Sequence, residues 1–120
     1  MTEGWPEDAS VLHNADSIVI YCDGGGRHPY VTHLDELNKL AEQGVGMVNL
    51  HYGVEVPKGP AGDAFLRWIG GYFEEWWSVN PHWVADYKNL PEHPISNGVA
   101  PFSINDEWYY HMRFQPEMKS

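Results

Sequence analysis

The chain has 120 residues, of which 42% are hydrophobic, so it has room for one domain with a core and is too apolar for a disordered protein. Seven basic residues, no two of them adjacent, stand against seventeen acidic ones, for a formal charge of −10. This balance argues against nucleic acid and anionic membranes as partners, because both bind through clustered positive charge.

The single cysteine, Cys22, excludes an internal disulfide. No stretch approaches the roughly 18 apolar residues of a membrane span. The N-terminal sequence MTEGWPEDAS is acidic and polar, which is unlike a signal peptide. We therefore expect a cytoplasmic protein that meets neutral small molecules or cations.

The first half of the chain predicts a strand, a helix and a second strand. SIVIYC (17–22) is almost unbroken in apolar character, as in a strand covered on both faces, and the loop DGGG (23–26) follows it. A stripe of apolar residues predicts a helix over 31–43, and MVNL (47–50) predicts a second buried strand that ends at His51. These loop lengths indicate a βαβ unit with parallel strands.

The second half of the chain is less regular. Its patterns predict a helix over 62–73, a strand over 83–87 and a terminal strand over 107–114, with a proline-rich loop over 89–106. The first strand comes late for a doubly wound sheet. We therefore expect an α/β sheet that lacks its N-terminal strand and helix.

Four segments resemble the trehalose-utilisation (ThuA-like) domain family, in the same order and over roughly residues 4–114. They are ADSIVIYCDGGGRHP, GVGMVNLHYGVEVPKGPAGDAFLRWIGGYF, WSVNPHW and HPISNGVAPFSINDEWYYHMRF. The resemblance implies a flavodoxin-like, class I glutamine-amidotransferase-like fold, which is a three-layer sandwich with a mainly parallel sheet. Residues 1–120 would form a single, partial ThuA-like domain.

The same resemblance implies a role in carbohydrate utilisation, on trehalose or a keto-sugar. In the amidotransferase relatives, the turn after the equivalent strand presents a nucleophilic cysteine. His51 stands at that position here, so thiolate acyl transfer is not available and we do not expect glutaminase activity.

Candidate site residues gather where the first two parallel strands should end, since ligands bind at the carboxyl edge of such sheets. His51 is a candidate general base or metal ligand, or alternatively a histidine that hydrogen-bonds a neighbouring loop. In the glycine-rich loop, Asp23, Gly25 and His28 are candidate substrate-binding residues, because closely spaced backbone amides can approach a hydroxylated ligand.

Two later motifs supply further candidates. In WSVNPHW, His82 and Trp83 would suit a sugar platform with a polar edge. In NDEWYYH, Glu107, Tyr109 and His111 would share one face of a strand. We expect Glu107 to be a catalytic acid or base and Tyr109 to bind substrate.

These residues leave several functions open. His51, His82 and Glu107 could hold a divalent metal such as zinc, although no HExxH spacing supports it. The first hypothesis is an enzyme acting on a sugar derivative through His51 and Glu107. The alternatives are a non-catalytic sugar-binding or accessory domain, and a structural interaction module whose exposed sheet edge pairs with another chain. A homo-oligomer also stays open.

Overall fold

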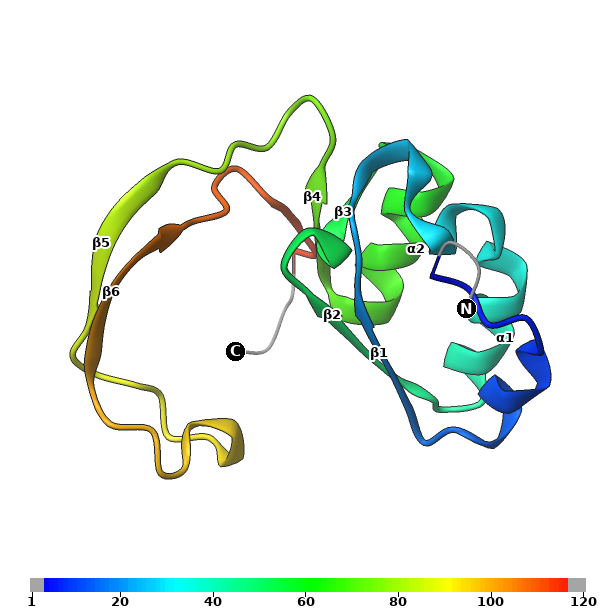
Figure 1. Ribbon diagram of the computed structural model, residues 1–120, viewed down its shortest axis with the longest axis horizontal. Coiled ribbons are helices and arrows are strands. Elements are labelled where there is room, and N and C mark those ends of the chain that lie inside the picture. Colours follow the sequence, from blue (N-terminus) through cyan, green and yellow to red (C-terminus); the bar gives the residue numbers. More distant parts are fainter. Residues whose placement is uncertain (1–3, 117–120) are drawn as a thin grey trace.

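The structure is a computed structural model that describes residues 4–116 (Figure 1). Its helices and strands are β1 (Ser17–Tyr21), α1 (Leu34–Glu42), β2 (Gly46–Leu50), β3 (Glu55–Val56), α2 (Pro60–Ile69), β4 (Gly71–Glu74), β5 (His82–Tyr87), β6 (Phe102–Glu107) and β7 (Arg113–Phe114). Short 3-10 turns lie at η1 (Ala9–Asn14), η2 (Gly25–Arg27), η3 (Pro29–Thr32), η4 (His51–Val54) and η5 (Pro94–Ser96).

The predicted βαβ unit is confirmed. Strands β1 and β2 are parallel, with Ser17 opposite Gly46 and Tyr21 opposite Leu50. Helix α1 connects them, and Gly44 follows it with a φ of +91°, a left-handed conformation that glycine adopts without steric cost. The carboxyl ends of β1 and β2 therefore meet at one edge.

The predicted flavodoxin-like sandwich with a mainly parallel sheet is wrong for this chain. Among the described residues, parallel pairing is limited to β1–β2 and to the two-residue pair β3–β4, whereas β4–β7 and β5–β6 are antiparallel. The turn η4 separates β2 from β3, and Pro57, which lacks a backbone N–H, directly follows β3. The strands of residues 4–116 therefore form three short, separate sheets.

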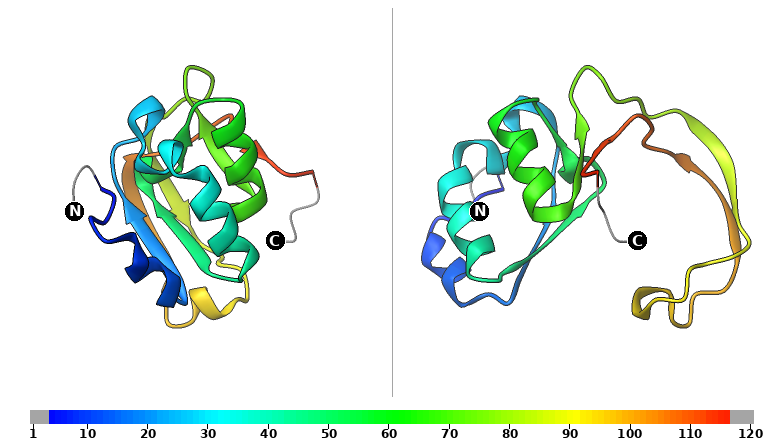
Figure 2. Two further views of the ribbon diagram at one scale, coloured as in Figure 1. Left: turned by 90° about the vertical axis from the view of Figure 1, so that its right-hand side faces the viewer. Right: turned by 180° about the vertical axis from the view of Figure 1, so that it is seen from behind.

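Residues 4–116 cover the β1–β2 pair on one face only. Helices α1 and α2 lie together on that face (Figure 2). The buried core there consists of Ile20, Tyr30, Leu37, Leu40, Val56, Ala61, Phe65 and Tyr72. The opposite face exposes Val19, Tyr21, Val48 and Leu50.

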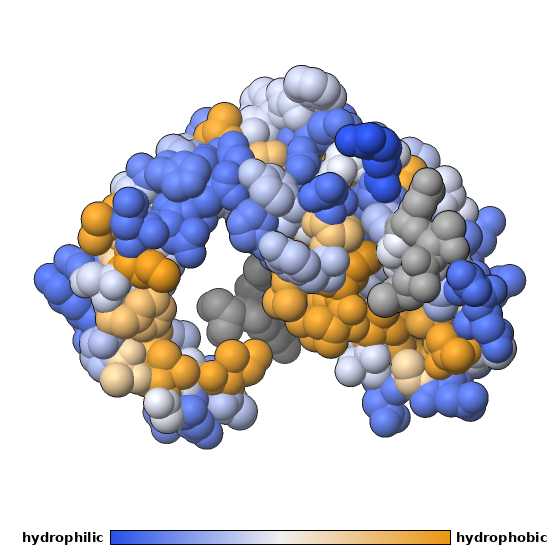
Figure 3. Space-filling model, in the orientation of Figure 1, coloured by the Kyte–Doolittle hydropathy of each residue, from blue (hydrophilic) through white to orange (hydrophobic). Residues whose placement is uncertain are grey.

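The expected third layer is therefore absent from residues 4–116, and the strand at 17–22 is not buried on both faces. Figure 3 shows apolar surface in the region of β1 and β2, beside the open space under the β5–β6 hairpin. Among the described residues, no helix has the length and apolar character needed to cross a membrane.

Three predicted boundaries in the second half are also wrong. The helix predicted over 62–73 ends at Ile69, because Gly70 adopts a left-handed φ of +79° and residues 71–74 form β4. The loop predicted over 89–106 contains most of β6. The strand predicted over 107–114 is interrupted: Glu107 ends β6 instead of starting a strand, Tyr110 forms an isolated bridge, and only residues 113–114 form β7.

Strands β5 and β6 form a hairpin that arches away from the helices (Figure 1). Its register places His82 opposite Glu107 and Tyr87 opposite Phe102. At the base of the hairpin, an antiparallel bridge joins Val79 to Tyr110 and leads the chain back to the body of the molecule. The end of β6 therefore lies close to β4.

A partly buried ion pair attaches β7 to β4. Glu74 is 6% exposed and accepts a hydrogen bond from Arg113 Nε at 2.8 Å and another from the Tyr72 hydroxyl at 3.1 Å. The bonds from Arg113 hold the pKa of the Glu74 carboxyl below its usual value. The guanidinium also lies 4.3 Å from the centre of the Trp77 ring.

We predict that Arg113→Met lowers the melting temperature at about pH 7, because the variant leaves Glu74 buried without a cation. The loss of stability should be smaller at about pH 3.5. A carboxylate whose pKa is lowered by folding stabilises the protein fully only above its pKa in the unfolded chain, and this contribution disappears as the pH falls. Circular dichroism melts at both pH values test this. Arg67→Met, at an exposed arginine of α2, is the control, and an equal loss in both variants would contradict the prediction.

Candidate functional site

His51 is the first residue after β2 and stands in η4. Its φ is +54°, a left-handed conformation that histidine tolerates better than most residues but that still costs energy. The side chain is 42% exposed, and Nε2 lies 3.3 Å from Glu107 Oε2. An accessible imidazole paired with a carboxylate is an arrangement suited to proton transfer.

Glu107, the last residue of β6, has a side chain that is only 12% exposed. Its Oε1 accepts hydrogen bonds from the Tyr52 hydroxyl at 2.8 Å and from Asn80 Nδ2 at 2.6 Å. The same amide nitrogen lies 3.1 Å from the Tyr52 oxygen. Both carboxylate oxygens are therefore engaged, Oε1 by these donors and Oε2 by His51. The bond to Glu107 also raises the pKa of Tyr52.

Tyr109 contacts the other side of the imidazole. Its hydroxyl oxygen lies 3.0 Å from His51 Nδ1. Its ring packs against Phe73 and Tyr52, at centroid distances of 5.0 and 5.9 Å. Burial and the nearby charge of Glu107 raise the pKa of Tyr109, so the phenol stays protonated at neutral pH.

The turn that carries His51 is held by side chains from β2 and the glycine-rich segment. The Gly53 carbonyl accepts hydrogen bonds from His28 Nε2 at 2.9 Å and from Asn49 Nδ2 at 2.7 Å. His28 is 1% exposed, and its Nδ1 accepts a bond from the Tyr30 amide at 3.1 Å. Its burial does not support the predicted substrate-binding role, and His28 instead positions the turn.

The glycine loop lies at the same edge as His51, as expected from the parallel strands. A Cβ atom at Gly24 would lie 2.4 Å from Glu55 Cβ and 2.8 Å from the Tyr52 carbonyl oxygen. Gly25 is buried, has a φ of +75° and lies against the Glu75 carboxylate. Burial, and after it the charges of Glu75 and Glu107, raise the pKa of Glu55. These glycines thus allow close packing beside the site.

The remaining predicted residues do not join this cluster. Asp23 is exposed in the loop after β1. His82 is exposed and lies opposite Glu107 in the hairpin register, and Trp83 alternates with it onto the other face, with its ring 5.6 Å from that of Trp108. Within residues 4–116 no three His, Cys, Asp or Glu side chains converge as metal ligands, so the predicted set of His51, His82 and Glu107 is not assembled.

Sequence reasoning missed Tyr52 and Asn80. Tyr52 directly follows His51, and Asn80 belongs to the motif WSVNPHW, where the neighbouring His82 drew attention instead. Glu107 was already a candidate acid or base, and a poorly hydrated carboxylate needs hydrogen-bond donors besides its imidazole partner. That need is the signal that could have directed attention to polar residues next to the candidates, such as Tyr52 and Asn80.

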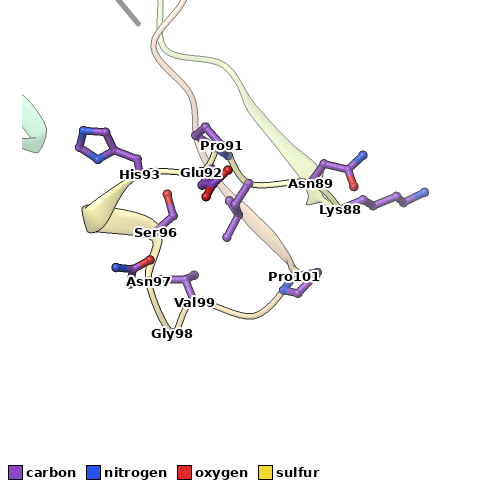
Figure 4. A pocket seen from close by; sticks show the side chains of 11 residues that line it. Lys88, Asn89, Pro91, Glu92, His93, Ser96, Asn97, Gly98, Val99 and Pro101 are labelled. Carbon is purple, nitrogen blue, oxygen red and sulfur yellow. The ribbon is translucent and has the colours of Figure 1, made fainter.

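A separate hollow of about 410 Å³ lies at the far end of the β5–β6 hairpin. Its lining comes from the connecting loop between Lys88 and Pro101 and includes none of the residues that contact His51. Figure 4 shows these side chains spread around the loop, with the His93 ring directed away from it. Of its titratable lining groups, Lys88 lies 4.0 Å from Asp86 and His93 Nδ1 accepts a hydrogen bond from the Ile95 amide. Because these groups face partners outside a shared centre, we place the candidate site at His51.

No protein-family model, curated protein or solved structure matches the chain.

We predict that the free energy of unfolding falls as the pH is lowered from about 7.5 to about 5.5. Burial lowers the pKa of His28 in the folded protein. As the pH falls through the usual histidine pKa, the unfolded chain therefore binds a proton that the folded protein does not bind, and this favours unfolding. Urea unfolding at both pH values measures this. His28→Gln should be less stable at the higher pH and show a smaller fall.

The exposed His93→Gln variant is the control for that experiment and should keep the fall seen in the unaltered protein. A His28→Gln variant with an undiminished pH dependence would assign the effect to other groups.

We also predict that Gly24→Ala destabilises the protein by about 1–3 kcal/mol, since the added methyl group would overlap Glu55 and the Tyr52 carbonyl. Gly26→Ala is a matched control two residues away, because no atom lies within 4 Å of a Cβ placed there. Denaturant unfolding of both variants gives the comparison. Equal stabilities would mean that the loop does not pack closely on the turn.

Proposed function

We propose that this chain is a ThuA-like domain of carbohydrate utilisation that acts on a sugar or keto-sugar through His51 and Glu107. The observation that carries the proposal is the 3.3 Å approach of His51 Nε2 to Glu107 Oε2, with the imidazole exposed and the carboxylate held by other donors. The four motifs that resemble the family include both residues.

The chemistry that suits this pair is proton abstraction from a carbon beside a keto group. A carbonyl acidifies the neighbouring C–H bond, and a neutral imidazole is a competent base near pH 7. Glu107 would hold the imidazole and stabilise the positive charge that it gains. The proposal gives no role to a metal ion, because the cluster brings together only two of the three predicted ligands.

A second candidate function is a non-catalytic sugar-binding domain. One face of the hairpin carries a row of aromatic rings in contact, with centroid distances of 4.9–5.6 Å: Phe102, Tyr87, Trp108 and Trp83. Trp83 is 43% and Phe102 44% exposed, so this face could stack on sugar rings without any reaction.

Hydrogen exchange in deuterium oxide separates the two functions. We expect the protein to exchange the proton beside the carbonyl of a glucoside that carries a ring ketone, followed by NMR. His51→Ala and Glu107→Gln should each slow this exchange by about 10²- to 10⁴-fold.

His13→Ala, at an exposed histidine of η1, is the control and should keep the full rate. Exchange no faster than in buffer would contradict catalysis on keto-sugars. Calorimetric sugar binding that survives His51→Ala but is lost in Trp83→Ala would then favour the binding domain.

A further inference from the structure

Both ring nitrogens of His51 are engaged within the protein. Nδ1 lies 3.0 Å from the Tyr109 hydroxyl and Nε2 lies 3.3 Å from Glu107 Oε2. An imidazole can take a proton only at a nitrogen with a free lone pair. His51 therefore cannot take a proton directly from a ligand while both contacts persist.

The contact with Glu107 decides which nitrogen of His51 carries the hydrogen. Glu107 Oε1 accepts hydrogen bonds from Tyr52 and Asn80, and Oε2 lies 3.3 Å from His51 Nε2, so we infer that the imidazole hydrogen is on Nε2, where it faces the carboxyl oxygen. A neutral imidazole has one N–H, which leaves Nδ1 as an acceptor. The Tyr109 hydroxyl must then donate to Nδ1.

We propose that Tyr109 is the catalytic residue that meets the substrate and that it passes a proton to His51. This inference rests on the proposed function. The hydrogen of the Tyr109 hydroxyl points at Nδ1, so its oxygen keeps lone pairs for the proton of a bound keto-sugar. Asn80 and Tyr52 are positioning residues, because both donate hydrogen bonds to Glu107 Oε1.

The step balances without any further reactant. The C–H bond beside the ketone breaks, its proton goes to the Tyr109 oxygen, and its electron pair forms the enolate. At the same time the original hydroxyl proton moves to His51 Nδ1, and the resulting imidazolium lies against the Glu107 carboxylate. The raised pKa of Tyr109 fits this role, since a free phenolate does not accumulate and the phenol loses its proton only as His51 accepts it.

Tyr109→Phe tests the role of the hydroxyl while keeping the ring that packs on Phe73. We expect the variant to exchange the keto-sugar proton at least about 10²-fold more slowly, with sugar binding changed by no more than a few-fold. Tyr110→Phe removes the neighbouring exposed hydroxyl and should keep the wild-type rate. If the wild type exchanges the keto-sugar proton and Tyr109→Phe does so at the same rate, the inference is overturned and the proposed function stands.

Nitrogen NMR of isotope-labelled histidine tests the hydrogen-bond direction without a substrate. We expect neutral His51 to carry its hydrogen on Nε2, and Tyr109→Phe to shift the Nδ1 resonance without changing this tautomer. A hydrogen on Nδ1 in the wild type would overturn the relay. If the wild type shows the expected tautomer but does not exchange the keto-sugar proton, the proposed function is overturned, and the catalytic role of Tyr109 is overturned with it.

The positioning role has its own test. Tyr52→Phe and Asn80→Ala should each shift the carbon NMR resonance of the Glu107 carboxyl group, because each removes a hydrogen-bond donor to Oε1. Asn105→Ala, at an exposed residue of β6, is the matched control and should leave it unchanged. An unchanged Glu107 carboxyl resonance in both site variants would overturn the assignment.

Discussion

The Glu107 carboxylate joins the end of the β5–β6 hairpin to the turn after β2. A carboxylate that is only 12% exposed would be costly without polar partners. Here two segments supply them: Tyr52 of η4 and Asn80 donate hydrogen bonds, and His51 of η4 lies 3.3 Å away. Removal of this one group would leave the hairpin attached to the body mainly by the bridge at Val79 and by β7. The candidate site depends on this contact.

The turn itself stores some strain, which the surrounding structure offsets. His51 adopts a left-handed backbone conformation, and the carbonyl of Gly53, two residues later, accepts two side-chain hydrogen bonds. Gly24 lies so close to the turn that no side chain fits between them. The imidazole is thus placed by buried neighbours and not by its own contacts alone, as an effective site requires.

Local pattern was enough to predict the βαβ unit and the position of His51 at its carboxyl edge, because both follow from periodicity and from the right-handed crossover. The contact of His51 with Glu107 involves residues far apart in sequence. It depends on the path by which the hairpin returns, which local pattern does not encode. The expected strand over 107–114 was wrong, yet Glu107 and Tyr109 still meet His51, from its two sides.

The expected third layer failed for a related reason. A nearly unbroken apolar run such as SIVIYC indicates that both faces avoid water, but it does not show which segment covers the second face. In residues 4–116 the helices cover one face and leave Val19, Tyr21, Val48 and Leu50 exposed. The apolar pattern of a strand thus predicts that its side chains avoid water. The number of layers in the fold depends instead on which segments of the chain pack against the strands.

The charges around the cluster bear on the kind of ligand it would accept. Glu55 packs against Gly24 and Glu75 against Gly25 of the glycine loop, and the raised pKa of Glu55 reflects burial first and then repulsion from Glu75 and Glu107. This negative potential would stabilise an imidazolium formed during proton transfer and oppose an anionic group. A phosphorylated sugar would bring like charge to the site, so under the proposed function the local field favours a neutral sugar, in agreement with the formal charge of −10 for the whole chain.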